Sequence, residues 1–155
     1  MKSPEITMTP RPIPIPYAYR LSYRITLSCI ILYFCVGQKA CSVTKFQAIN
    51  NALLIPKAKE QLIELLSSKN NLIKELRFDP HIETILKFLL TEDLIHYQKS
   101  NDLIRLTENG KKFAQIIIDE KNLLTNEIVF LKEYSTLLKK ELDLKIAFIE
   151  KQIMR

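Results

Sequence analysis

Glycine is almost absent from this sequence. Only Gly37 and Gly110 occur among 155 residues, and there is no tryptophan. A dinucleotide-binding fingerprint requires three glycines and a nucleophile elbow requires two within five residues, so both motifs are excluded. A phosphate-binding loop is excluded as well, because the position five residues before Gly110 holds Arg105 instead of glycine. So few glycines favour a mainly helical protein with few tight turns.

Histidine and cysteine are also scarce, which limits metal binding and catalysis. His81 and His96 lie in different predicted elements, with no carboxylate or cysteine at metal-ligand spacing. Cys29, Cys35 and Cys41 are six residues apart, so a helix would point successive thiols to opposite faces. We therefore expect free, buried thiols in a reducing cytoplasm. We expect no metal site, no cofactor and no enzymatic activity.

Residues 25–37, "ITLSCIILYFCVG", form an apolar run that could be interpreted as a membrane segment. Arg24 and Lys39 leave only 14 residues between them, too few to span the roughly 30 Å hydrocarbon core as a helix. A signal peptide would place its basic residues directly before the run, whereas a proline-containing stretch precedes this one. The sequence therefore predicts a buried first helix over residues 20–36, with a membrane anchor as the alternative.

Residues 1–19 differ from the rest of the chain in their prolines. "TPRPIPIPYAY" has prolines at alternate positions, which excludes helix and predicts an extended N-terminal arm. Ile13, Ile15 and Tyr17 would project from this arm as an apolar series for partner binding. A disordered tail is the alternative.

Residues 20–120 read as one domain, mainly α with a small β-hairpin. Ser42 is predicted to cap a second helix, and Pro56 to begin a third. A short helix or turn follows over 70–78, and Asp79 and Pro80 are predicted to start the next helix. The predicted core-facing positions of these three helices are Val43, Phe46, Ile49 and Leu53, then Leu62, Leu65 and Leu66, and then Ile82, Ile85, Leu86 and Leu89.

The stretch "LIHYQKSNDLIRL" predicts two short strands around a turn at Ser100–Asn101. Thr107 follows the second strand and is predicted to cap another helix, whose first turn contains Glu108 and Gly110. Helix, hairpin and helix in this order predict the second half of a winged helix-turn-helix domain. An unspecified α+β arrangement is the alternative.

Residues 121–155 are predicted to contain one long amphipathic helix, which starts at Thr125. Its apolar residues recur in steps of three or four, which is typical of the seam of a coiled coil or a bundle. The seam consists of Leu131, Tyr134, Leu138, Leu142, Ile146, Ile149 and Ile153. We expect the seam to pair with another chain, because it is long for so small a domain. Packing back onto the domain is the alternative.

The net charge of +6 would suit a nucleic acid, but half of it lies within residues 1–24. A DNA-reading helix should present Arg, Lys, Asn or Gln, whereas residues 80–91 offer only Lys87, beside Glu83. We therefore expect a protein-docking module, with at most weak, non-specific contact to nucleic acid. The candidate residues for that backbone contact are Lys99, Arg105, Lys111 and Lys112.

Four stretches together resemble a known family. They are "RLSYRITLSCIIL", "SVTKFQAINNAL", "LRFDPHIETILKFLLTEDLIHY" and "DLIRLTENGKKFAQIII". The combination, over roughly residues 20–120, resembles the middle component of bacterial ABC-three-component systems, the group that includes Lamassu-type anti-phage and anti-plasmid defence. Its most specific element is "RFDP" at 77–80, followed by Leu106, Thr107 and Gly110. This chain departs from the family at "TEDLIHY", where a small glycine-containing turn is usual.

The resemblance implies an accessory subunit, which agrees with the expected absence of catalytic chemistry. Such components are encoded between an SMC-like ATPase and an effector, often a nuclease. They would bridge the two and hold the effector inactive until foreign DNA is sensed. The alternative function is a winged-helix transcriptional regulator that dimerises through its C-terminal helix.

Overall fold

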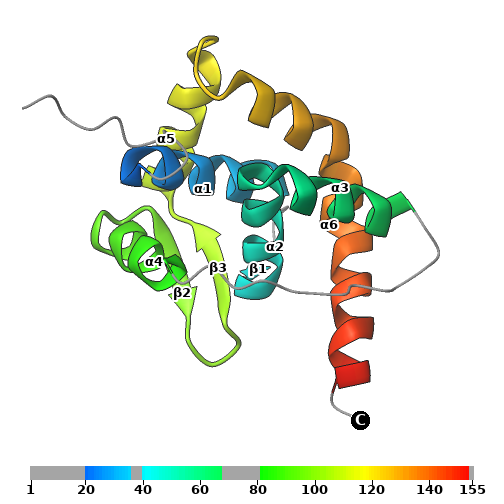
Figure 1. Ribbon diagram of the computed structural model, residues 1–155. Coiled ribbons are helices and arrows are strands. Elements are labelled where there is room, and N and C mark those ends of the chain that lie inside the picture. The colour runs from blue at the N-terminus through cyan, green and yellow to red at the C-terminus, as the bar shows by residue number, and fades with distance from the viewer. Residues whose placement is uncertain (1–19, 36–39, 68–80, 154–155) are drawn as a thin grey trace, which may run out of the picture.

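Six α-helices and three short strands make up the part of the chain that the computed structural model describes, residues 20–35, 40–67 and 81–153 (Figure 1). Their order is α1 (Leu21–Cys35), β1 (Cys41–Ser42), α2 (Val43–Leu54), α3 (Pro56–Ser67), α4 (Ile82–Thr91), β2 (Ile95–Gln98), β3 (Leu103–Leu106), α5 (Glu108–Asp119) and α6 (Thr125–Ile153). The predicted α+β class, mainly helical with a small antiparallel sheet, is confirmed.

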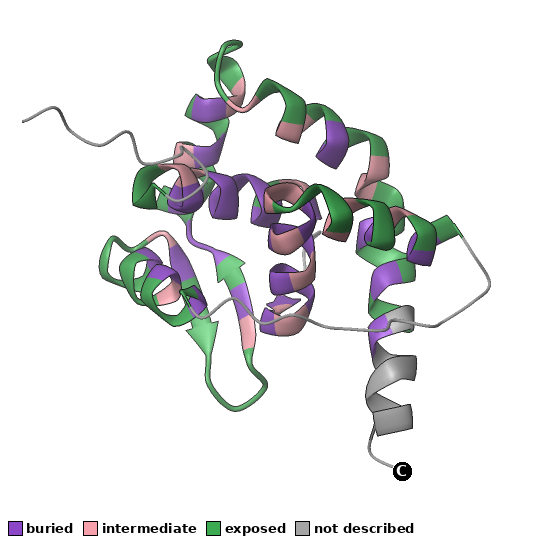
Figure 2. Cartoon of the chain, viewed as in Figure 1, coloured by how far each residue is buried: buried purple, intermediate pink, exposed green. Residues whose placement is uncertain are grey.

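Helix α1 is the centre of the molecule and packs against α2, α4, α5, α6 and β3. Apolar residues occur all around it, a pattern that is typical of a helix buried on every side. Figure 2 shows α1 as mostly buried, and the side chains of Leu27, Ile30 and Ile31 have no exposed surface. The predicted buried first helix is therefore confirmed. None of the described helices is long and apolar enough to cross a membrane.

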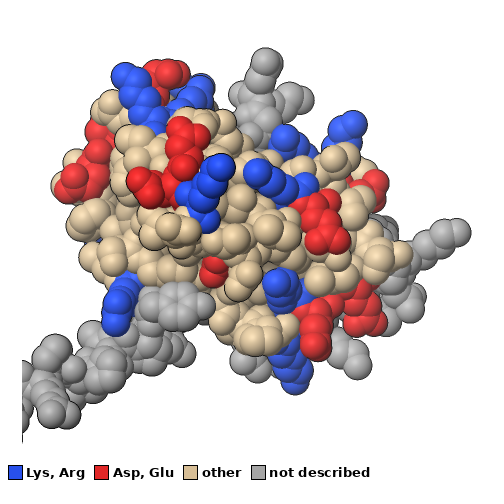
Figure 3. All heavy atoms as spheres, turned by 90° about the horizontal axis from the view of Figure 1, so that it is seen from above, with Lys and Arg blue, Asp and Glu red and all other residues tan. Residues whose placement is uncertain are grey.

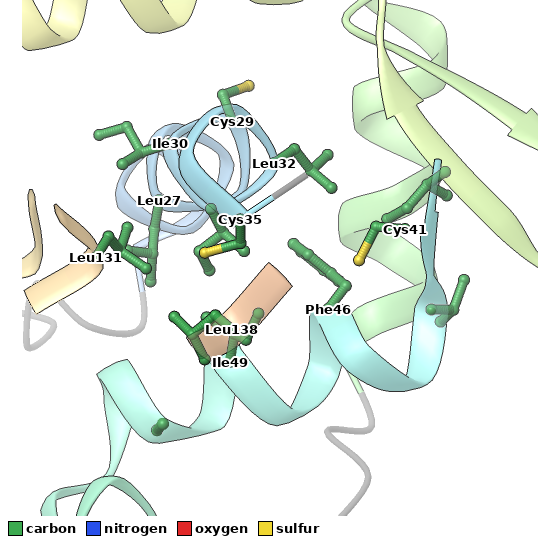
Figure 4. Close-up of a cluster of buried hydrophobic side chains, with 14 of the residues drawn as sticks. Leu27, Cys29, Ile30, Leu32, Cys35, Cys41, Phe46, Ile49, Leu131 and Leu138 are labelled. Atoms are coloured by element: carbon green, nitrogen blue, oxygen red, sulfur yellow. The ribbon is translucent and has the colours of Figure 1, made fainter. Parts of the chain in front are cut away.

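The main core lies where α1, α2 and α6 meet. Figure 4 shows side chains from these three helices turned toward one another, among them Leu27, Cys35, Phe46, Ile49, Leu131 and Leu138. Most of the core-facing positions predicted from helical spacing are buried. Leu53 and Leu86 are only half-buried, at the edges of their stripes. Burial of this continuous apolar cluster is the main favourable contribution to folding.

Local signals place three of the helix starts as predicted. The Ser42 side chain accepts a hydrogen bond from the Lys45 main-chain N at 3.1 Å, which caps α2. Helix α3 begins at Pro56. The Thr107 side chain accepts from the Gly110 main-chain N at 3.0 Å, which caps α5.

The predicted start of α4 is wrong by two residues. The helix begins at Ile82, and its first main-chain hydrogen bond runs from the Ile85 N to the His81 O. His81 therefore holds the N-cap position, where its side chain makes no capping hydrogen bond. Asp79 and Pro80, together with the predicted short element at 70–78, lie outside the described residues.

The sheet has the strand order β1-β3-β2 and is antiparallel throughout. Strands β2 and β3 form the predicted hairpin, with Ile95 opposite Leu106 and Gln98 opposite Leu103. Strand β1 was not predicted, because two residues are too short to show an alternating pattern. The Val43 N donates to the Asp102 O at 3.1 Å and extends the contact between β1 and β3.

Helix α6 begins at Thr125, as predicted. Figure 1 shows that its first turns (gold) run across the top of the molecule, and the rest (orange to red) runs down past α3 and α2. It packs against α1, α2 and α3 along this path. The side chains of residue 145 and residues 147–153 lie outside the description.

Candidate interaction surfaces

The junction between α4, the hairpin and α5 contains the Leu106, Thr107 and Gly110 of the family resemblance. The Thr107 hydroxyl donates to the Asp93 O at 2.6 Å while it caps the Gly110 N. A Cβ atom at position 110 would lie 2.1 Å from the Leu94 O and 2.9 Å from Leu106 Cδ2. These three residues therefore hold α5 against the turn that follows α4.

The turn after α4 is closed by an aspartate in a left-handed conformation. Asp93 has φ 55°, in the left-handed region that favours glycine. The Leu94 N donates to the Leu89 O and the Asp93 N to the Leu90 O, the paired bonds of a Schellman motif. The Asn109 side chain donates to Asp93 Oδ2 at 2.9 Å. Asp93 therefore occupies the left-handed position at which helices most often end on glycine, and the β2–β3 hairpin follows directly.

The exposed face of α4 is mixed in chemistry. Its solvent-facing residues are Glu83, Thr84, Lys87, Phe88, Leu90 and Thr91. Phe88 is 37% exposed and Leu90 is 42% exposed, whereas Lys87 is the one cation of the helix. This composition is poor in side chains that read base edges and includes two large apolar groups.

The four candidate residues for nucleic-acid contact are all exposed, but they lie on two different elements. Lys99 is in the hairpin turn, and Arg105 lies opposite His96 on the sheet. Lys111 and Lys112 lie on α5, where Lys111 Nζ is 3.3 Å from Glu108 Oε1. Figure 3 shows the molecule from above, away from the hairpin turn at the bottom of Figure 1, and charges of both signs are interspersed on this upper face.

The predicted partner-binding seam of α6 faces the chain's own core. Leu131, Leu138 and Leu142 have no exposed surface, Ile146 is 5% exposed, and Tyr134 is half-buried. This corrects the expectation that the seam pairs with another chain, because these side chains already pack against the helices of their own domain. The remaining seam residues, Ile149 and Ile153, and the arm residues Ile13, Ile15 and Tyr17 lie outside the described side chains.

A second apolar face of α6 was not predicted from the sequence. Leu137 is 36% exposed and Leu144 is 67% exposed, and their spacing of seven residues places them on one face. The same stripe begins with Phe130, which is buried under Lys59 of α3, whose Nζ lies 4.6 Å from the ring centroid. The spacing of Phe130, Leu137 and Leu144 was the signal that could have revealed this face.

Lys45 joins α2 to α6 through a buried ammonium group. Its Nζ lies 3.1 Å from Asp143 Oδ2 and 3.4 Å from the Lys139 O, and the side chain is 5% exposed. Helical spacing alone did not reveal this contact, since a lysine is usually assigned to the solvated face. The long aliphatic stem of Lys45 lies among core residues while the charge reaches a carboxylate.

The three cysteines are free and buried, as predicted. Burial raises the pKa of each thiol to about 12, so they stay protonated at neutral pH and are poor nucleophiles. No cluster of three or more metal-ligating side chains occurs among the described residues.

Three described surfaces could therefore contact another molecule. They are the exposed face of α4, the β2–β3 hairpin, and Leu137 and Leu144 of α6, which we call the outer leucines. Searches for related proteins add no evidence about which of them is used. No family model, no curated protein and no solved structure matches the chain.

Proposed function

We propose that the protein is a non-catalytic accessory subunit of a bacterial defence complex. In this role it bridges an SMC-like ATPase and an effector, often a nuclease, in the sensing of phage or plasmid DNA. The proposal starts from the resemblance of residues 20–120 to the middle component of ABC-three-component systems. The "RFDP" at 77–80 lies outside the described residues, so the structural support comes from elsewhere.

The proposed fold of the docking unit is a winged helix-turn-helix. Supporting this are the short strand between α1 and α2, the helix α4 directly before the hairpin, and the strand order β1-β3-β2. Helix α4 takes the place of the recognition helix in this interpretation. Helix α3 is then an insertion into the usual three-helix arrangement.

The observation that carries the proposal is the surface of α4. A helix that reads DNA needs several side chains that reach base edges and phosphates, and α4 presents Lys87 beside Glu83. It also exposes Phe88 and Leu90, and aromatic residues are enriched at protein interfaces. We therefore propose that α4 docks a protein rather than reading a DNA sequence.

The regulator hypothesis is less well supported by the described residues. It requires dimerisation through the C-terminal helix, yet Leu138 and Leu142 of the α6 seam are fully buried within the chain. A dimer through this part of the seam would require α6 to leave its own core.

Co-expression with the neighbouring genes tests the proposal. We expect an adjacent gene for an SMC-like ATPase, and co-purification of its product and the effector with the tagged chain. Substitution of Phe88 and Leu90 by serine should abolish co-purification of at least one partner while the thermal melt is retained. The matched control is Lys87→Ser on the same face, which should keep the complex. A chain that purifies alone beside both partners would contradict the proposal.

A further inference from the structure

The β2–β3 hairpin has two faces of different character. Ile95, Ile104 and Leu106 are buried on the inward face, and Tyr97, opposite Ile104, lies on the same face but is 37% exposed. The alternate residues point outward: His96, Gln98, Leu103 and Arg105. His96, Gln98 and Arg105 are exposed, and Leu103 is half-buried.

The outward face carries positive charge and neutral hydrogen-bond donors. Arg105 lies opposite His96, Gln98 lies one position along the same face, and Lys99 follows in the turn. Within the described part of the chain, neither Lys99 nor Arg105 has an ion-pair partner. Their charges are therefore available to an outside anion.

Asp102 is the one carboxylate in residues 95–106, and it is held away from this face. The Tyr97 hydroxyl donates a hydrogen bond to Asp102 Oδ1, and this bond raises the pKa of Tyr97. Because Tyr97 projects from the inward face, its hydroxyl draws the carboxylate toward that side. The Val43 N, bonded to the Asp102 O, fixes the main chain of the same residue.

We propose that the outward face of the hairpin contacts the phosphate backbone of duplex DNA without reading its sequence. A two-stranded ribbon fits into a DNA groove, and Arg, Lys, Gln and His supply hydrogen bonds to phosphate oxygens. With only two full charges the contact is weak, and its affinity falls steeply with salt. The inference rests on the hairpin alone and does not require the accessory-subunit role.

Fluorescence anisotropy of the full chain with a labelled, mixed-sequence duplex tests this contact. At low salt, Lys99→Gln with Arg105→Gln should raise Kd about tenfold or more, and should flatten the plot of log Kd against log salt by about two. The control exchanges two exposed lysines elsewhere, Lys57→Gln with Lys132→Gln, and should change Kd by less than about twofold. Equal effects of the two pairs, or no binding by the native chain at low salt, would overturn the proposal.

The hydrogen bond from the Tyr97 hydroxyl to Asp102, which we call the tether, gives a second, independent test. Tyr97→Phe releases the carboxylate, which should weaken DNA binding by about threefold through added repulsion. Asp102→Asn in the Tyr97→Phe background should restore or exceed the native affinity. An unchanged Kd for Tyr97→Phe would show that this hydrogen bond does not affect DNA binding. Competition by polyglutamate as strong as by unlabelled duplex would show an acidic protein surface as the ligand and overturn the assignment to DNA.

Discussion

Gly110 packs so tightly against the Leu94 carbonyl group, at the junction between the hairpin and α5, that no side chain fits between them. The Cβ that any other residue would carry at position 110 would lie 2.1 Å from the Leu94 carbonyl oxygen. That oxygen also accepts a hydrogen bond from the Thr107 N at 3.0 Å, so it cannot move away without breaking the link between strand and turn. Glycine is required here by space, since its φ is not positive.

Gly110→Ala is predicted to destabilise the protein by about 1–3 kcal/mol, the usual cost of forcing atoms into a packed site. Helix propensity alone would predict the opposite, a gain of about 1 kcal/mol for alanine within a helix. The sign of the change in urea denaturation therefore decides between the two effects. Lys112→Ala, exposed on the same helix, should stay within about 0.5 kcal/mol of the native chain.

Thr107→Val should cost about 1–2 kcal/mol of unfolding free energy. Valine keeps the shape of the side chain, but it loses the bond to the Asp93 O and the cap on the Gly110 N, both at a buried position. Thr107→Ser keeps the hydroxyl and should lie within about 0.5 kcal/mol of the native value. Equal urea midpoints for the valine and serine variants would contradict this role of the hydroxyl.

The features that the sequence predicted correctly are those set by local chemistry. Ser42, Pro56 and Thr107 each determine a helix start through their own side chains or ring, and the turn around Ser100–Asn101 separates two strands of matched length. Such signals act within a few residues and do not depend on the rest of the fold.

The features that were missed depend on contacts between distant parts of the chain. The period of the α6 seam shows that one face is apolar, but Leu138 is buried by α1 and α2, which lie far away in sequence. Lys45 is buried because Asp143 is positioned to receive it. Strand β1 exists only because β3 lies beside it. The periodicity of a sequence shows which face of a helix is apolar, but it does not show which part of the protein packs against that face.

The thiols are predicted to be unreactive in the native state and to make stability fall at high pH. The pKa of each cysteine rises from 9.0 to about 12 on folding. The stabilisation that the protonated thiols give the folded state is complete below pH 9.0, and it is lost as the pH rises toward about 12. It is lost because the unfolded chain, with the lower thiol pKa, releases its protons first. Native protein should resist a thiol reagent at neutral pH, and guanidinium chloride should expose all three groups.

Urea denaturation at increasing pH measures the same effect. A variant with alanine at Cys29, Cys35 and Cys41 should lose stability less steeply with pH than the native chain. Lysines and tyrosines also change stability at high pH, but both proteins contain them, so the difference between the two curves reports the thiols alone. Parallel curves for the two proteins would show that the thiols do not contribute, and rapid labelling without denaturant would show that they are accessible.

The α6 seam provides the sharpest test of the fold. Leu138 and Leu142 are fully buried, so replacing both with aspartate should cost several kcal/mol and abolish cooperative unfolding of the whole domain. Leu144→Asp makes the same exchange on the same helix at a side chain that is 67% exposed, and should leave the thermal melt almost unchanged. If the double variant kept a native melt, α6 would not pack on its own chain. If Leu144→Asp unfolded the protein, the outer leucines would belong to the core.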